Sequence, residues 1–396
     1  MRVLNDFVFG LGMVVAGCST NSGAQMSTGG GSAEGGGYTG GLLISAGAGG
    51  LGSAGNGSTS GGTAQGAAGG GAESATMVRL VAAKFVNDIA VKDGFVYYSD
   101  FDDDAAGETS GHVAKISTAG GTPTILARAT PAATAGGIAL LIAKAVVVHG
   151  SSVYWTESRF DMPPRLAKIS IDGGDIVDVW SDPNCSDILP PLAIDGDDLY
   201  WMAGCAGTTL LTVSTTGGTA RVVASGSGDL WLRPGSAWTP DSENRSLTVA
   251  NGFAFWTRNT DPVVSLPLSG GTMPNQIGSF FVVSGPSAIV FFDDRLFITG
   301  NDYMLQSKGA VLSLVPGETI NTIADKQNIE AYSALAVDDT NVYWGVNDSI
   351  KSAPRGGGSA ATVASSLANP HSFALDATHI YFADDTGIFR APKQAR

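Results

Sequence analysis

A four-strand pattern that recurs along most of the chain constrains the fold more than any other feature of the sequence. It is clearest in residues 335–364, which read LAVDDTNVYWGVNDSIKSAPRGGGSAATVA. Four short apolar or alternating runs are separated there by turn residues, a spacing typical of antiparallel strands joined in a meander. The sequence therefore predicts an all-β chain built from repeated four-stranded units.

Each unit is recognised by an aromatic second strand, and seven such strands are present. They are Val96-Tyr97-Tyr98, Val153-Tyr154-Trp155, Leu199-Tyr200-Trp201, Ala254-Phe255-Trp256, Leu296-Phe297-Ile298, Val342-Tyr343-Trp344 and Ile380-Tyr381-Phe382. Tight turns rich in Asp, Asn and Gly precede them, and these residues suit hairpins because they tolerate positive φ or bond their own backbone. We interpret the aromatic side chains as core between units rather than as platforms for a ligand.

The seventh unit lacks a fourth strand, because its third strand, residues 388–392, is the last apolar run. A matching run, residues 78–83, precedes the first unit just as residues 362–364 precede the seventh. Pairing of this run with the last unit would close a ring and leave only short, protected sheet edges. The sequence thus predicts a single β-propeller over residues 76–396, with seven four-stranded blades closed by an N-terminal strand.

The second strands resemble the Tyr-Trp-Thr-Asp propeller repeat, most closely at Tyr154-Trp155-Thr156-Glu157. The resemblance covers most of residues 77–396. It implies the fold and little about activity. Proteins with this repeat usually have six blades, so six blades are the alternative to the seven units counted along the chain.

The N-terminus has the pattern of an export signal. An apolar run, residues 7–16, is shorter than the roughly 20 residues that span a bilayer, but it suits the core of a signal peptide. Its ending, Val15-Ala16-Gly17-Cys18, resembles the bacterial lipobox, in which the cysteine is lipidated and becomes the first residue after cleavage. The resemblance implies a signal peptide over residues 1–17, a lipid anchor on Cys18 and a place in the bacterial cell envelope. Ser19 favours the outer membrane, and the alternative is a plain signal peptide with an incidental cysteine.

Residues 18–75 are of low complexity and consist mainly of Gly, Ser, Ala and Thr. The whole chain contains 55 Gly in 396 residues, about double the usual share of roughly 7%. A segment of this composition buries too little apolar surface to offset its ordering entropy. We expect a disordered tether between the anchored cysteine and the propeller.

The charge of the chain limits its partners. Asp and Glu number 36 against 22 Lys and Arg, which gives a formal net charge of −14. An acidic surface repels phosphate backbones, so nucleic acid is excluded as an expected partner. The expected partners are the membrane, through the lipid anchor, and a protein, peptide or glycan ligand, and the chain is expected to be a monomer.

Strand order divides the loops between two opposite faces of the ring. Turns between the first and second strands, and between the third and fourth, share one face and are uniformly short; we call it the short-turn face. Connections between the second and third strands, and between blades, share the other face and are long and varied; we call it the long-loop face. Because binding residues concentrate on irregular loops held by a rigid scaffold, the long-loop face is the predicted functional face.

Two groups of residues on this face are candidates for chemistry. Cys185 and Cys205 flank the first hairpin of the third blade, and the oxidising compartment of an exported protein favours a disulfide over two free buried thiols. Asp100, Asp102 and Asp104 place carboxylates at alternate positions, an arrangement that suits a Ca²⁺ ion. A solvated acidic loop without a metal is the favoured interpretation, so no cofactor is expected and Ca²⁺ is the alternative.

An insertion over residues 225–245 carries the predicted binding residues Trp231, Arg233 and Trp238. Aromatic and Arg side chains are common anchors of binding sites. The alternative, which the sequence supports equally, is that the insertion packs on itself or closes the mouth of the central channel. No nucleophile, paired-histidine or phosphate-binding motif stands out. The leading hypothesis is a non-enzymatic binding or scaffolding module, and the runner-up is a propeller hydrolase or lyase that uses loop carboxylates, with or without a divalent cation.

Overall fold

The computed structural model describes residues 77–103, 109–128, 141–159, 162–205, 208–226, 247–258, 261–271, 274–277, 284–302, 308–315, 320–327, 329 and 334–393. All of them belong to one compact unit, Leu42–Arg396. Within these ranges no helix has the length and apolarity of a membrane span. The signal peptide, the tether and five predicted site residues lie outside the described residues, and the predictions for them stay predictions; those five are Cys18, Asp104, Trp231, Arg233 and Trp238.

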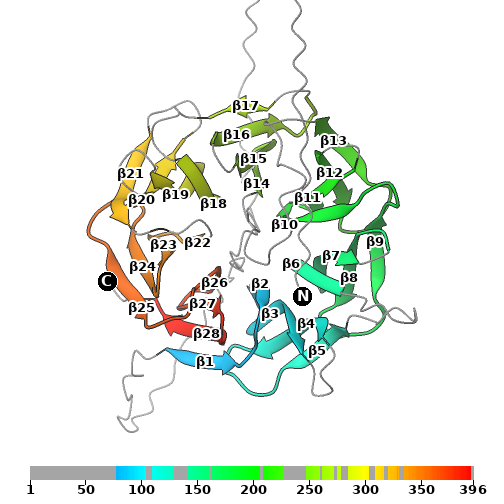
Figure 1. Cartoon of the computed structure of the whole chain (residues 1–396), viewed down its shortest axis with the longest axis horizontal. Helices are drawn as coiled ribbons and strands as arrows, with labels where there is room; N and C mark the ends of the chain where they lie inside the picture. Colours follow the sequence, from blue (N-terminus) through cyan, green and yellow to red (C-terminus); the bar gives the residue numbers. More distant parts are fainter. Residues whose placement is uncertain are drawn as a thin grey trace, which may run out of the picture. The chain divides into compact units, whose positions relative to one another are not determined.

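The fold consists of seven four-stranded antiparallel sheets arranged as blades in a ring (Figure 1). The strands of each blade are given from the innermost outwards. Blade 1 consists of β2 (Val86–Lys92), β3 (Phe95–Asp103), β4 (Thr109–Ser117) and β5 (Thr124–Arg128), and blade 2 of β6 (Leu141–His149), β7 (Ser152–Arg159), β8 (Arg165–Ser170) and β9 (Val177–Ser181). Blade 3 consists of β10 (Asp187–Asp195), β11 (Asp198–Gly204), β12 (Thr208–Ser214) and β13 (Arg221–Gly226). Blades 4 and 5 are β14 (Leu247–Ala250), β15 (Phe253–Arg258), β16 (Asp261–Pro267), β17 (Asn275–Gln276); and β18 (Ser284–Phe292), β19 (Arg295–Asp302), β20 (Lys308–Leu314), β21 (Asn321–Gln327). Blades 6 and 7 are β22 (Leu335–Val337), β23 (Asn341–Val346), β24 (Ser349–Pro354), β25 (Ala361–Ser365); and β26 (Ser372–Leu375), β27 (His379–Asp384), β28 (Gly387–Pro392), β1 (Val78–Val81).

Blade 7 is completed by the N-terminal strand, as predicted. Strand β1 pairs antiparallel with β28, with Val78 opposite Arg390 and Val81 opposite Ile388. Figure 1 shows the two ends of the described chain, β1 in blue and β28 in red, side by side. The innermost strands of successive blades contact one another around the ring, including β26 against β2. The chain is therefore a closed seven-bladed β-propeller, and the alternative of six blades is wrong.

The aromatic residues of the second strands form the core between blades. Trp155 is 1% exposed, and Trp201, Trp256 and Trp344 are 0% exposed. Each hydrophobic cluster joins two neighbouring blades; Tyr154 of blade 2, for example, packs with Trp201 of blade 3. The prediction of core aromatics is confirmed, and it explains the repeat: each blade needs large apolar side chains on both faces of its second strand.

The two faces of the ring differ only in part as the sequence predicted. The second and third strands are joined by just two residues in blades 6 and 7, at 347–348 and 385–386, although the prediction made these connections long. The third and fourth strands of blade 1 are separated by six residues, 118–123, although the prediction made these turns uniformly short. The hairpins between first and second strands are tight, and Asp93-Gly94 and Asn251-Gly252 both adopt positive φ at their two central residues. This is the backbone that matches the right-handed twist of paired strands, and it explains why Asp, Asn and Gly recur there. The connections between blades leave from the opposite face, and the candidate site lies at that end of the sheets.

Candidate functional site

Cys185 and Cys205 form a disulfide at the long-loop end of blade 3. Their Cα atoms are 3.9 Å apart, and the sulfur atoms are bonded at 2.03 Å. The two residues flank the β10–β11 hairpin, and the backbone N–H of Ser186 donates to the carbonyl of Gly204 at 2.8 Å between them. The predicted disulfide is confirmed, and it fixes the point where the chain enters and leaves this hairpin.

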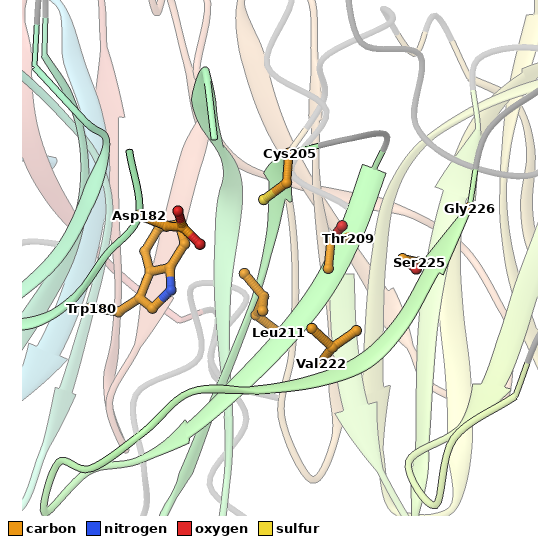
Figure 2. Close-up of a pocket in the computed structure, with 8 residues that line it drawn as sticks. All are labelled: Trp180, Asp182, Cys205, Thr209, Leu211, Val222, Ser225 and Gly226. Atoms are coloured by element: carbon orange, nitrogen blue, oxygen red, sulfur yellow. The ribbon is translucent and has the colours of Figure 1, made fainter. Parts of the chain in front are cut away.

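A cavity of about 340 Å³ lies beside the disulfide, where blade 2 faces blade 3. Its lining residues are Trp180, Asp182, Cys205, Thr209, Leu211, Val222, Ser225 and Gly226. Figure 2 shows Trp180 and Asp182 on the blade 2 side and the remaining residues across the gap on blade 3, with the Cys205 sulfur turned toward the blade 2 side. The volume falls within the usual range of small-ligand sites, roughly 300–1,000 Å³.

A β-bulge in each outer strand turns these side chains into the gap. In β9, Trp180 lies opposite Leu166 while Asp178 lies opposite Ala167, so one extra residue interrupts the alternation. Trp180 and Asp178 consequently point to opposite sides of the sheet although they are two positions apart. A bulge in β13 does the same on the other wall, where Val222 lies opposite Leu211.

The Trp180 indole is held by packing rather than left at the surface. It lies against the cluster between blades 2 and 3, and its ring centroid is 5.3 Å from that of Trp201 at an interplanar angle of 58°. Tilted pairs at this separation are favourable beyond simple area burial. One wall of the cavity is therefore a pre-formed aromatic surface.

Asp182 supplies the charged group of the cavity and also shapes its rim. Its Oδ1 accepts hydrogen bonds from the backbone N–H and the side-chain amide of Asn184, both at 2.9 Å. Its carbonyl accepts the backbone N–H of Cys185 at 3.2 Å. This turn leads directly into the disulfide, so the position of the carboxylate is fixed by local hydrogen bonds.

The predicted metal-binding aspartates are only partly within the described residues. Asp100 is 6% exposed on β3, and its Oδ1 lies 3.2 Å from Nδ1 of His112. The other ring nitrogen, Nε2, lies 2.9 Å from Nη1 of Arg128. Because Arg can only donate, Nε2 accepts and Nδ1–H donates to Asp100. The carboxylate thus has a protein partner, in a chain of side chains that runs from β3 to β5.

Asp102 lies two positions further along β3, and Asp104 lies outside the described residues. Over the described part of the chain, no group of three or more His, Cys, Asp or Glu side chains is placed to hold a metal ion. The Ca²⁺ site stays a prediction. It is tested by the melting temperature of the full-length protein, which would rise with added Ca²⁺ and fall again with a chelator.

A second buried carboxylate, Glu157, also has hydrogen-bond partners within the protein. It is 4% exposed and accepts hydrogen bonds from Nε1 of Trp155 at 2.9 Å and from Nε and Nη2 of Arg165 at 3.0 Å each. Arg165 also donates to Asp178 at 2.7 Å. Burial lowers the pKa of Arg165, but the carboxylates of Glu157 and Asp178 outweigh it and raise that pKa. The hydrogen bonds of Glu157 and Arg165 link strands β7, β8 and β9 of blade 2.

Apart from Cys205, the residues that line the cavity were not predicted from the sequence. Trp180 is the one clear signal, because it is a tryptophan in an outer strand, away from the aromatic positions that repeat in every second strand. Asp182 and Val222 carry no such mark. The sequence predicted the disulfide beside the cavity, and the long-loop face stays the predicted functional face.

The comparisons with known proteins are consistent with the fold. No protein-family model matches the sequence, and no curated protein matches it. Among solved structures, virginiamycin B lyase from Staphylococcus aureus is similar at a TM-score of 0.55 and 14% identity, over 81% of this chain and 99% of that one. YCF48 bound to D1 peptide is similar at 0.54 and 10% identity, over 81% and 95%. The β-propeller domain of the Trilobed protease from Pyrococcus furiosus is similar at 0.50 and 9% identity, over 79% and 97%. At these identities the likeness shows the β-propeller fold alone.

Proposed function

We propose that this propeller is a binding module whose ligand enters the cavity between blades 2 and 3 from the long-loop face. The observation that carries the proposal is the cavity itself: a rigid indole on one wall, an exposed Val222 on the other and a disulfide at the rim. Rigid walls favour binding because little conformational freedom is lost when the ligand arrives. The buried carboxylates of Asp100 and Glu157 already have partners, which favours a binder over a hydrolase or lyase that relies on them.

A polypeptide is the class of ligand that the fold comparison favours. YCF48, a propeller of similar fold, was solved with the D1 peptide bound. Val222 is 55% exposed in the cavity wall, so its side chain is accessible to another chain that enters the cavity. We therefore propose a protein or peptide partner, with the propeller acting as a scaffold.

We further propose that the propeller is held at the bacterial cell envelope by lipid on Cys18, with residues 18–75 as the tether. The support is the lipobox-like ending at Cys18 and the Gly-rich composition that follows it. Replacement of Cys18 by Ser should release the protein from the membrane fraction. Unchanged partitioning would contradict the anchor without affecting the binding proposal.

The binding proposal is tested by placing a photo-crosslinking amino acid at Val222 in the full-length chain and irradiating the cells that express it. We expect a discrete adduct at Val222 that disappears when Trp180 is also changed to Ala. The matched control is Phe253, which is 38% exposed and starts β15 directly after a turn on the short-turn face. Equal adducts at Phe253, or none at Val222, would contradict the proposal.

A further inference from the structure

We propose that the cavity between blades 2 and 3 takes a cationic group on an apolar stem, namely the side chain of a Lys or Arg of the partner polypeptide. The inference deepens the proposed binding function of the same cavity and rests on it. Three properties of the cavity support it: the apolar side chains of Leu211 and Val222, the aromatic ring of Trp180 and the single negative charge of Asp182.

The apolar part of the cavity suits the stem. Leu211 is 5% exposed and lines the cavity from β12, while Val222 stands beside it on β13 with 55% exposure. Lys and Arg bury their methylene stems along surfaces of this kind and keep the charged head in a polar environment. A stem laid along these two residues would run toward the blade 2 wall, which Figure 2 shows across the gap.

The blade 2 wall suits the charged head. Trp180 presents the aromatic ring that attracts cations most strongly, and Asp182 lies two residues further along the same chain at the rim. The two hydrogen bonds from Asn184 to the Asp182 carboxylate both engage Oδ1. Oδ2 can accept a charge-assisted bond from an ammonium or guanidinium group without breaking the turn.

The charge balance selects a cation over other ligands. Asp182 is the one charged side chain among the described residues that line the cavity, and no Lys or Arg is among them. An anionic ligand would be repelled, and a purely apolar one would cover a carboxylate without compensating it. The net charge of −14 acts in the same direction over a longer range by attracting basic partners.

The test uses full-length protein labelled with 5-fluorotryptophan and observed by fluorine NMR, with the Trp180 signal assigned from Trp180→Phe. The probes are hexylammonium, neutral hexanol and methyl glucoside. We expect hexylammonium to shift the Trp180 signal with about tenfold higher affinity than hexanol at low salt, which corresponds to roughly 1.4 kcal/mol. The preference should shrink in high salt because the charge contact is partly exposed.

Two variants separate the specific contact from bulk charge. Asp182→Asn keeps an oxygen acceptor for the Asn184 turn but removes the charge, and it should reduce the preference for hexylammonium to about twofold or less. Asp175→Asn removes an equal charge from a turn on the short-turn face, where Asp175 is exposed, and should leave the preference intact. Unchanged melting temperatures for both variants establish that each is folded.

A pair of capped peptides then tests the source of the cation. They are identical except for a central Lys or its neutral isostere norleucine. The Lys peptide should bind more tightly than hexylammonium and the norleucine peptide more weakly than the Lys peptide. Tighter binding of the free amine than of the Lys peptide would overturn the assignment to a polypeptide.

Three results would overturn the cationic ligand: equal affinity for hexanol and hexylammonium, equal losses in Asp175→Asn and Asp182→Asn, or tighter binding of methyl glucoside. The crosslinking experiment distinguishes this failure from failure of the binding function. An adduct at Val222 that persists in Asp182→Asn means that the ligand class is wrong and the site is right. Absence of any adduct at Val222 removes the site itself.

Discussion

Blade 7 and blade 3 have the same four strands but are completed in different ways. The outer strand of blade 7 is β1, supplied from the other end of the chain, and its Leu80 is only 6% exposed. The outer strand of blade 3 is β13, which follows directly from β12 and leaves Val222 55% exposed. At Leu80 the outer strand of the closing blade is packed, whereas at Val222 the outer strand of blade 3 borders a cavity. The difference separates the part of the ring that maintains closure from the part proposed to bind a ligand.

Blade 7 is tied to both of its neighbours by polar contacts. Arg390 donates to the carbonyl of Thr118 in blade 1 at 2.8 Å. On the other side, Nζ of Lys393 lies 2.9 Å from Oδ2 of Asp338 in blade 6. Blade 3 is tied to blade 2 by polar contacts as well, such as Nζ of Lys144 to Oδ1 of Asp187 at 3.2 Å, and it has in addition an internal covalent link, the Cys185–Cys205 disulfide. Closure thus depends on contacts between distant segments, whereas one hairpin of blade 3 is also fixed by a local covalent bond.

The largest effect is expected from Gly387→Ala, which disrupts the pairing of β1 with β28 that closes the ring. A Cβ at Gly387 would collide with the carbonyl oxygen of Val81, which belongs to backbone and cannot move without displacing β1. We expect a loss of about 4 kcal/mol in the free energy of unfolding, because overpacking is combined with loss of the ring seal. Denaturant unfolding of the purified protein measures it.

The matched control for Gly387 lies in blade 3. A Cβ at Gly204 would meet only the side-chain oxygen of Ser186, at 3.4 Å, an ordinary contact. Gly204→Ala should therefore cost less than about 1 kcal/mol, within the range of a tolerated substitution. Equal losses of unfolding free energy at the two positions would mean that the closing strand pair is no more sensitive to an added methyl group than a hairpin of blade 3.

The next effect comes from removing the disulfide in the double variant Cys185→Ala, Cys205→Ala. The two cysteines are 20 residues apart, and a cross-link over a loop of this length stabilises by about 3 kcal/mol. Reduction of the wild-type protein should lower the melting temperature by the same amount as the double variant. A reductant that lowers the melting temperature of the double variant as well would show that the effect is not due to this bond.

The sequence revealed most of the fold because the fold is made of local repeats. Hairpin turns and second-strand aromatics are recognised from neighbouring residues. Closure between the distant ends could also be predicted, because the last unit lacks a fourth strand and an extra strand precedes the first unit. The cavity could not be read in this way. Its walls come from Trp180 and Val222 in different blades, and bulges reverse the side-chain alternation that pattern reading assumes. The Asp100–His112 contact was missed for a similar reason, since it depends on the register between β3 and β4.

A smaller effect is expected on acidification, and it should differ in sign between the closing region and blade 3. Burial alone would raise the pKa of Asp338, but hydrogen bonds from Lys393, Asn341 and Thr340 outweigh it and lower the pKa from 3.8 to about 2. The ionised carboxylate therefore contributes stability that is complete above about pH 4 and is lost as the pH falls through about 2. Asp338→Asn should cost about 2 kcal/mol at pH 7 and almost nothing at pH 2.

Asp195, at the corresponding hairpin of blade 3, is the control. Burial and then the nearby Asp198 carboxylate raise the pKa of Asp195, so its ionised form is disfavoured in the fold. Asp195→Asn should leave the free energy of unfolding at pH 7 unchanged or slightly increased, because it removes an unfavourable buried charge. Protonation of Asp195 on acidification should remove the same charge and have the same effect. Unfolding curves of both variants between pH 2 and pH 7 give the comparison; parallel losses would contradict the assigned pKa directions.

The smallest effect is expected from Val222→Ala, and it most directly separates binding from stability. Val222 is more than half exposed, so truncation should change the free energy of unfolding by less than about 0.5 kcal/mol. Leu80→Ala on the outer strand of blade 7 removes a buried side chain and should cost about 2–3 kcal/mol. If Val222 contacts the stem of a cationic ligand, its truncation weakens hexylammonium binding while the melting temperature stays in place, and Leu80→Ala does the reverse. A stability loss at Val222 as large as that at Leu80 would mean that the cavity wall is ordinary core, and the contrast between the two blades would fail.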